Sequence, residues 1–249
     1  MKIALQMYSI RACEPQDLLL RLEKVKEMGF DAVEFAGFGN YDAQTLRNKL
    51  DAVGLVCQGS HTMVEQILAD PEGVLSFHKT LGASTIVCPF HKAPDGGDAK
   101  AHWLQYAKTL NEAGKLVAAA GMQFGYHNHS HEFADIGGTC AEDIIFQNTD
   151  PAYVKMQLDT CWVENAGFSA VDVMNEYKSA LSMLHIKELT AVGDPTAKIV
   201  GTGCIEFPAI VALAKKLGVQ WYTIEHEATE GDIYGDITKG LHHLRNLLK

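Results

Sequence analysis

The sequence predicts an α/β protein, a closed (β/α)8 barrel that occupies residues 1–249 as a single domain. Short apolar segments alternate with amphipathic segments eight times, and a glycine repeatedly separates a predicted helix from the strand that follows it. The GxGxxG pattern of a dinucleotide-binding sheet does not follow the first strand, which weakens the open-sheet alternative. A length of 249 residues also suits one barrel of about 250 residues.

The first four units each pair an apolar segment with a helical pattern. Leu18, Leu22 and Val25 illustrate the helical spacing of apolar residues that marks the helices. Strands are expected at Ile3–Tyr8, Ala32–Phe35, Leu55–Ser60 and Thr85–Cys88, and helices at Pro15–Met28, Ala43–Val53, Pro71–Leu81 and Ala99–Ala120.

The remaining four units repeat this order. Strands are expected at Met122–Asn128, Val154–Leu158, Leu181–Ile186 and Trp221–Ile224, and helices at Ala141–Gln147, Val171–Ser179, Pro208–Leu217 and Asp236–Leu248. Glycine follows several of the helices directly, as at Gly54, Gly82 and Gly218, and glycine is the residue that most readily ends a helix. Such alternation implies parallel strands joined by right-handed crossovers.

The composition argues against nucleic acids and membranes as binding partners. The net charge of -10 argues against nucleic acid, because binding to phosphates requires clustered Lys and Arg. No apolar segment approaches the roughly 20 residues of a membrane span. The N-terminus lacks a signal-peptide pattern, and the six cysteines are scattered without a CxxC pair, so we expect a cytoplasmic protein with reduced thiols.

Acids and imidazoles cluster where the predicted strands end, which is where barrels of this class carry their chemistry. The segment Gly125–Phe133 is the densest such cluster. A mixed set of oxygen and nitrogen donors without thiolates suits Mn²⁺, Co²⁺, Zn²⁺ or Mg²⁺. The residues at these ends are Glu34, His61, His91, His127, His129, Glu132, Asp159, His185, Lys187, Glu225, His226 and Glu227.

Several motifs together resemble the xylose-isomerase-like TIM barrels that include sugar phosphate isomerases and epimerases. The motifs are Gln6-Met7-Tyr8-Ser9-Ile10-Arg11, Val33-Glu34-Phe35-Ala36-Gly37, Tyr126-His127-Asn128-His129-x-x-Glu132-Phe133, Gln157-Leu158-Asp159-Thr160-x-Trp162-Val163, Leu184-His185-Ile186-Lys187-Glu188 and Ile224-Glu225-His226. The resemblance spans the chain in matching order, and the fifth-strand motif marks a YHNHxxEF subgroup.

The resemblance implies one divalent metal ion, with Mn²⁺ expected first, held by a Glu, an Asp, a His and a second Glu. By position, Asp159, His185 and Glu225 match three of these ligands. The first ligand departs from the pattern, because better-known epimerases carry a carboxylate near the position of His127. Glu132 is therefore the candidate fourth ligand, and His127 is a candidate base or alternative ligand.

The implied activity is metal-dependent sugar or keto-sugar isomerisation or epimerisation, by proton abstraction next to a carbonyl through an enediolate. His127 and Glu225 are candidate bases, because a base for this proton needs a pKa near neutrality. The expected catalytic residues are His127, Glu132, Glu225 and Lys187, and the expected substrate-binding residues are Glu34, His61, His91, His129 and Trp162.

Other readings stay open. A lyase of the same family would remove the aglycone of a 3-keto-glycoside or water from a cyclic polyol, and the extra imidazoles favour it somewhat. A DNA-repair endonuclease conflicts with the net charge, and a sugar-binding protein without turnover conflicts with the many acids and bases.

Few Arg or Lys residues lie at the predicted rim, so the sugar is expected to be unphosphorylated. Gly201-Thr202-Gly203 is expected to be a turn rather than a phosphate cradle, and homo-oligomers are compatible with this fold.

Overall fold

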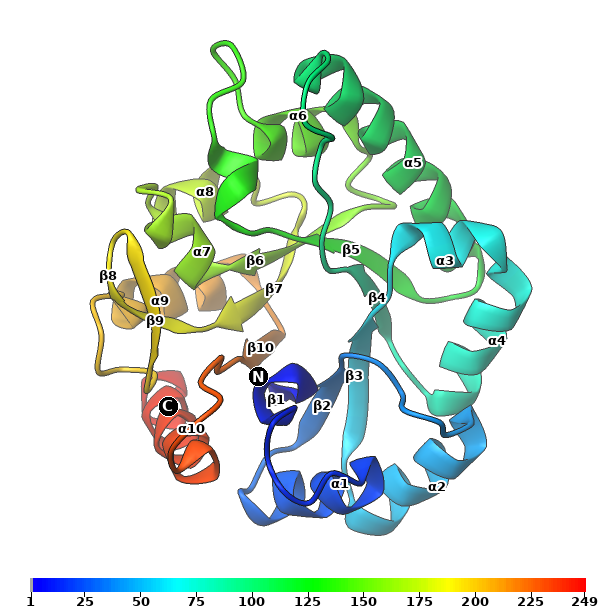
Figure 1. Cartoon of the computed structure of the whole chain (residues 1–249), viewed down its shortest axis with the longest axis vertical. Helices are drawn as coiled ribbons and strands as arrows, with labels where there is room; N and C mark the ends of the chain where they lie inside the picture. The colour runs from blue at the N-terminus through cyan, green and yellow to red at the C-terminus, as the bar shows by residue number, and fades with distance from the viewer. Residues whose placement is uncertain (1) are drawn as a thin grey trace.

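The computed structural model describes residues 2–249 and confirms the barrel (Figure 1). Its parallel strands close in the order β1-β10-β7-β6-β5-β4-β3-β2. The strands are β1 (Lys2–Gln6), β2 (Ala32–Phe35), β3 (Val56–His61), β4 (Thr85–Cys88), β5 (Gln123–His127), β6 (Lys155–Asp159), β7 (Leu181–Ile186) and β10 (Trp221–Ile224). All eight predicted strands are present; four have the predicted bounds, and the ends of the other four are shifted by one or two residues.

Helices surround the barrel and connect its strands (Figure 1). Gly54 and Gly82 end α2 and α4 with φ of 70° and 79°, a left-handed conformation that glycine adopts without steric cost. The α-helices are α1 (Leu18–Glu27), α2 (Ala43–Val53), α3 (Val64–Ala69), α4 (Pro71–Leu81), α5 (Ala99–Ala119), α6 (Ala141–Asn148), α7 (Thr160–Asn165), α8 (Ala170–Glu176), α9 (Phe207–Leu217) and α10 (Ile233–Leu248).

The elements that the sequence did not predict follow the C-terminal ends of strands. They are too short to show a clear hydrophobic period, which explains why periodicity missed them. Together they border one end of the barrel, which we call the C-terminal mouth. They are η1 (Met7–Ile10), α3, η2 (Ser130–Phe133), α7 and the antiparallel hairpin of β8 (Glu188–Ala191) and β9 (Asp194–Lys198).

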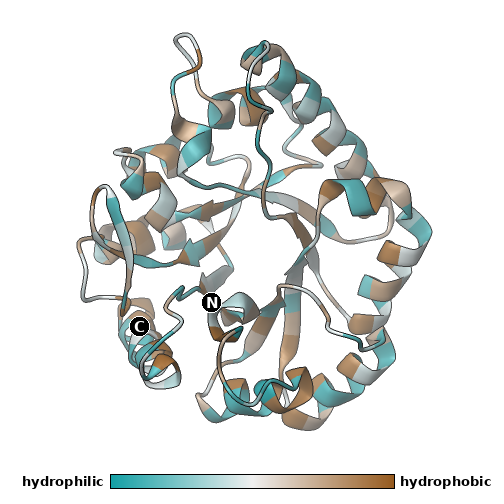
Figure 2. Ribbon diagram, in the orientation of Figure 1, coloured by the Kyte–Doolittle hydropathy of each residue, from teal (hydrophilic) through white to brown (hydrophobic). Residues whose placement is uncertain are grey.

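Two hydrophobic clusters lie around the barrel, and hydrophobic residues recur along the strands and helices (Figure 2). The barrel interior, in contrast, holds wholly buried polar side chains, among them Gln6, Glu34 and Gln157. These side chains come from different strands and bond to one another, so the centre of the barrel is a polar network. Within residues 2–249, no helix is both long enough and apolar enough to cross a membrane.

Candidate metal centre and active site

Four side chains converge at the C-terminal mouth: His127, Asp159, His185 and Glu225, which we call the ligand group. Each offers one nitrogen or oxygen atom, and these atoms all lie within 4.8 Å of one another. Parallel pairing explains the convergence, because Asp159 at the end of β6 lies in register with His185 on β7. Residues far apart in the sequence therefore share one point in space.

Asp159 is poised to bind a cation. Its Oδ1 caps α7 by accepting from the backbone N–H groups of Cys161 and Trp162 at 2.8 and 3.1 Å. Its Oδ2 is buried and has no hydrogen-bond partner among residues 2–249. Burial raises the pKa of this carboxyl, because the anion lies away from water. A cation beside Oδ2 would supply the missing partner.

His185 lies between two carboxylates. Its Nδ1 is 2.9 Å from Oε2 of Glu225, and its Nε2 is 2.6 Å from Oε2 of Glu34. Burial alone would lower the pKa of His185, but the neighbouring carboxylates outweigh burial and raise it to about 10. Burial likewise opposes the charge of Glu225, yet the hydrogen bond from His185 and the ammonium of Lys187 lower the pKa of this carboxyl.

The ligand group fits a divalent metal ion. Two imidazoles and two carboxylates provide a mixed nitrogen and oxygen set of the kind that binds Zn²⁺, Mn²⁺ or Co²⁺. Burial lowers the pKa of His127 well below its usual value, so this imidazole is neutral and offers a lone pair. The unpartnered Oδ2 of Asp159, 3.9 Å from Nε2 of His127, is the observation that supports the fit.

Glu132 does not join the ligand group, which differs from the sequence-based expectation. Its carboxyl group is wholly buried and accepts from the Tyr126 hydroxyl at 2.7 Å and from the His129 amide at 2.8 Å. Burial raises the pKa of Glu132 to about 8, so this group is largely protonated at neutral pH. His127, the alternative ligand, occupies the place that was expected for Glu132.

A cavity of about 390 Å³ opens beside the ligand group, and we call it the mouth cavity. Glu225 belongs both to the ligand group and to the cavity wall. The two acids of the wall both follow β10, whereas β3, β4 and β5 contribute imidazoles and an aromatic ring. The polar and aromatic lining residues are Tyr8, His61, Phe90, His127, His129, Glu225 and Glu227.

His61 and His129, two of the expected substrate-binding residues, line this cavity. Burial lowers the pKa of His129 to about 4, which keeps its imidazole neutral at physiological pH. Lys187 lies beneath the wall, with its ammonium 2.6 Å from Oε1 of Glu227. Burial alone would lower the pKa of Lys187, but Glu225 and Asp159 outweigh burial and raise it, so this side chain stays charged.

Three expected substrate-binding residues lie elsewhere. Trp162 stacks beneath Lys187, whose Nζ lies 3.9 Å from the ring centroid, and it does not line the cavity. Glu34 is wholly buried below the ligand group. His91 does not line the cavity, and its ring stacks on Tyr106 with the centroids 3.4 Å apart.

Gln157 lies beside the ligand group but is not among the candidate site residues that the sequence predicts. Its Nε2 donates to Glu34 at 2.6 Å, and its Oε1 lies 3.0 Å from His61 Nε2 and 3.1 Å from His127 Nδ1. Gln157 precedes Asp159 by two positions on β6. Residues two apart on a strand face the same side, so the strand period could have identified it.

The loop with Gly201-Thr202-Gly203 is a turn, as expected. The amide of Gly201 donates to Oε2 of Glu188 at 3.1 Å, and the amide of Ile205 donates to Oε1 at 3.1 Å. The protein's own carboxylate therefore occupies the donors that a phosphate would need.

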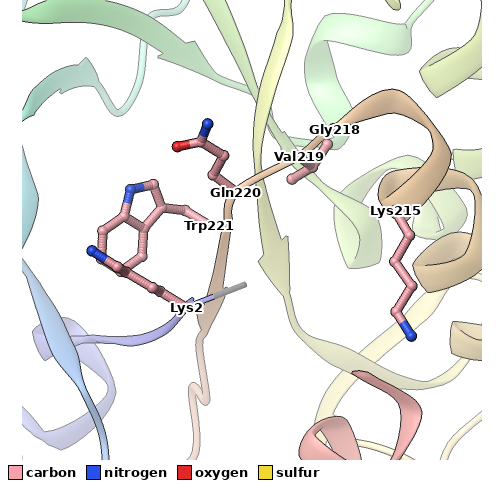
Figure 3. Close-up of a pocket in the computed structure, with 6 residues that line it drawn as sticks. All are labelled: Lys2, Lys215, Gly218, Val219, Gln220 and Trp221. Carbon is pink, nitrogen blue, oxygen red and sulfur yellow. The ribbon is translucent and has the colours of Figure 1, made fainter. Parts of the chain in front are cut away.

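A second hollow, of about 490 Å³, lies at the opposite end of the barrel, where the strands begin (Figure 3). The Lys2 side chain lies along the Trp221 ring, with Nζ 5.3 Å from the centroid, and Lys215 points away from both. The residues that line this hollow in the described chain include no acid and no imidazole, so it lacks the groups that proton transfer or metal binding needs.

Several known proteins are similar to this chain in sequence. An inosose dehydratase of Geobacillus kaustophilus is 22% identical over 246 residues, covering 83% of this chain and 79% of its own. Other inosose dehydratases match over about half their length, as in Clostridium beijerinckii, where 47% is covered at 24% identity.

Solved structures agree in fold. A sugar phosphate isomerase/epimerase of Parabacteroides distasonis superposes with a TM-score of 0.87 and 21% identity, covering 100% of both chains. The IOLI protein with a bound zinc atom superposes with a TM-score of 0.78 and 14% identity, covering 100% of this chain and 98% of that one.

The family model of the xylose isomerase-like TIM barrel matches residues 22–247, nearly the whole chain. Together with the closed barrel and the convergence of donor side chains at its C-terminal mouth, this match shows that the chain belongs to the xylose isomerase-like TIM barrel family.

Proposed function

We propose that the chain is a divalent-metal-dependent lyase that removes the proton next to the carbonyl of an uncharged keto-sugar or keto-polyol and then expels a β-substituent. One observation carries this proposal: both acids of the mouth cavity, Glu225 and Glu227, follow β10. The facing wall offers imidazoles and Phe90. A single acidic wall suits a reaction in which one base acts on one face of the substrate.

The residues supply a complete route for the proton. When bound, a divalent ion would polarise the substrate carbonyl and make the adjacent proton more acidic. Glu225 accepts this proton, and the electrons of the C–H bond form the new C=C bond as the C–O bond of the β-hydroxyl breaks. Glu225 then returns the proton to the departing oxygen, which leaves as water.

Two further residues stabilise this reaction. The Lys187 ammonium lies near Glu225 and lowers the pKa of this carboxyl, which keeps Glu225 ionised and able to accept the proton. The neutral imidazole of His129 lines the cavity and can hydrogen-bond a substrate hydroxyl.

The charges around the cavity support an uncharged substrate. Lys187 already pairs with Glu227. Arg11 stacks on Tyr8 and donates to the backbone carbonyls of Tyr8 and Glu227 at 2.9 and 3.3 Å. With both cations engaged and no cation in the cavity wall of the described chain, a phosphate would lack a partner. The similarity to inosose dehydratases supports a keto-cyclitol or a related ring as the substrate.

Isomerisation or epimerisation is the second candidate here, although the sequence taken alone favours it over elimination. It shares the initial proton transfer, and the similarity to the isomerase/epimerase structure of Parabacteroides distasonis favours it. Reprotonation from the opposite face needs a second acid there. The facing side chains include His61 and the neutral His129 but no carboxyl group in the described part of the chain, so elimination fits better than epimerisation.

NMR in D₂O separates the two reactions. Purified protein is first analysed for its metal, with Mn²⁺ still the first expectation, and is then incubated with inosose, unphosphorylated keto-hexoses and 3-keto-glycosides. We expect release of water or of an aglycone together with an unsaturated product. A deuterated epimer or isomer without elimination would contradict the lyase proposal. Glu225→Gln is the control that should abolish both outcomes.

A further inference from the structure

A small polar network lies directly beneath the ligand group. It consists of Gln6, Glu34 and Gln157, which we call the amide–carboxylate floor, and all three side chains are wholly buried. Glu34 accepts from Nε2 of Gln6 at 2.9 Å and from Nε2 of Gln157 at 2.6 Å. The three residues come from β1, β2 and β6, so the floor spans the barrel.

Glu34 fixes which way Gln157 points. A carboxylate only accepts hydrogen bonds, so the end of Gln157 that faces it must be the NH₂ group. The carbonyl oxygen of Gln157 must then face the opposite way, toward His61 and His127. This orientation follows from the chemistry of Glu34 and does not depend on how the two ends of the amide are assigned.

The oriented amide in turn fixes two imidazoles. A carbonyl oxygen only accepts, so His61 Nε2 at 3.0 Å and His127 Nδ1 at 3.1 Å must each carry a hydrogen. His61 Nε2 also lies 3.4 Å from Glu34, a second acceptor. With its proton on Nδ1, neutral His127 keeps the lone pair of Nε2, and that atom faces Asp159 at 3.9 Å.

Glu34 also acts directly on the third imidazole. Its Oε2 lies 2.6 Å from Nε2 of His185, so this nitrogen carries a hydrogen as well. The other nitrogen, Nδ1, faces Glu225 within the ligand group. A histidine whose second nitrogen donates to a carboxylate is held in one tautomer and one ring orientation, which is a common support for metal-binding histidines.

We propose that Glu34 is a positioning residue that sets the proton positions of three imidazoles at once, His185 directly and His61 and His127 through Gln157. It thereby turns Nε2 of His127 and Nδ1 of His185 toward the point where the four ligand atoms meet. The inference rests on the proposed function for the role of these atoms in metal binding. The proton positions themselves can be read without metal or substrate.

The test is ¹⁵N NMR of protein with labelled histidine, which distinguishes Nδ1–H from Nε2–H rings. In metal-free protein we expect Nε2–H for His61 and Nδ1–H for His127, and after Zn²⁺ addition Nε2–H for His185. In Glu34→Gln, the new NH₂ group must face either His185 or the NH₂ group of Gln157. At least one of these three imidazoles should therefore change its tautomer.

A second variant keeps the proposal testable if Glu34→Gln does not fold. Gln157→Leu removes the acceptor of His127 Nδ1, so His127 should become a tautomer mixture, while His61 and His185 keep Nε2–H through Glu34. Gln58→Leu is the matched control, because Gln58 is a buried amide of the same barrel that bonds to Met183 and is expected to leave all three tautomers unchanged.

Zn²⁺ titration calorimetry measures the consequence for the ligand group. We expect Glu34→Gln and Gln157→Leu to weaken Zn²⁺ binding about 10- to 100-fold, the range for losing such a support. Unchanged tautomers in folded Glu34→Gln, or Zn²⁺ affinity within twofold of wild type, would overturn the proposal. If wild-type protein binds no metal, the proposed function fails, while the tautomers of the metal-free protein still decide the role of Glu34.

Discussion

The two ends of the barrel carry hollows of similar size and opposite character. The hollow at the N-terminal end has about 490 Å³ and that at the C-terminal mouth about 390 Å³. The larger one is lined by residues without acids or imidazoles, among them Lys2, Lys215 and Trp221, whereas the lining of the smaller one includes imidazoles and acids. The difference teaches that volume does not locate the chemistry, whereas convergence of buried donor groups does.

The side chains at the two ends also differ in direction. At the N-terminal end, Lys2 covers the ring of Trp221, and Lys215 donates to the carbonyl of Leu247 at 2.9 Å, so the cations diverge (Figure 3). At the C-terminal mouth, His127, Asp159, His185 and Glu225 converge. The strands bring these groups together at their C-terminal ends, where barrels of this class carry their active sites.

Asp159→Asn is the strongest test of this contrast. The amide cannot supply an anionic ligand, so we expect loss of the bound metal and a fall in kcat/KM of at least about a thousand-fold, roughly 4 kcal/mol. Its carbonyl oxygen can still accept from Cys161 and Trp162, so the cap of α7 is kept. Elemental analysis and steady-state kinetics measure both effects.

Stability provides the control for that variant. Metal-free Asp159→Asn should unfold in urea at the same or a higher concentration than metal-free wild type, because the substitution removes the buried negative charge, whose Oδ2 has no hydrogen-bond partner. Full retention of metal and activity would show that the ligand group is not the reaction centre.

Lys187→Met should have the next largest effect. Met keeps an unbranched side chain but removes the ammonium, which lies 3.9 Å from the Trp162 ring centroid and 2.6 Å from Glu227. We expect kcat to fall about 100-fold, within the range for one lost electrostatic donor, while the metal content stays the same. Lys215→Met, a matched substitution at the N-terminal end, should leave kcat unchanged, and equal losses in both variants would contradict the assignment.

The fold was predictable because its signals are local and repeated. Apolar segments located all eight barrel strands, and glycines such as Gly54 and Gly82 located helix ends. Parallel pairing then implies that strand ends meet, so the convergence of Asp159, His185 and Glu225 followed from their positions alone. The one-turn elements around the C-terminal mouth were missed, because four to six residues show no clear period.

The orientation of individual side chains was not predictable in the same way. Glu132 and His127 lie in one motif, and the sequence does not show that the Tyr126 hydroxyl and a backbone amide engage Glu132. Glu34 ends a strand like the other candidates, yet it points into the barrel, where it meets Gln157 from the far side. Such contacts depend on which residues the closed barrel brings face to face.

The C-terminal mouth should also be the acid-sensitive end. Burial lowers the pKa of His91 to about 4, against about 6.5 in an unfolded chain. Between pH 6.5 and 4 the unfolded chain therefore binds a proton that the folded protein excludes, and stability falls as the pH falls. His91→Gln should reduce the loss of unfolding free energy between pH 7 and pH 5 by roughly 1 kcal/mol, after allowance for solvent screening.

Urea unfolding of the metal-free proteins at the two pH values measures this difference. Lys2→Ala, at the other end of the barrel, should follow the wild-type profile. If His91→Gln loses as much stability as wild type between pH 7 and pH 5, the neutral state of His91 does not contribute to the acid sensitivity.

Lys2→Ala should have the smallest effect on catalysis and is the sharpest check on the larger hollow. Lys2 begins β1 with an exposed side chain that contacts the Trp221 ring, and its backbone pairing with β10 does not depend on the side chain. We expect kcat/KM within about twofold of wild type, because an exposed substitution away from buried features changes stability by only about 0.5 kcal/mol. A change in kcat/KM of more than about tenfold would mean that a change in the N-terminal hollow affects the active site at the other end of the barrel. The contrast between a reactive and an inert end would then be wrong.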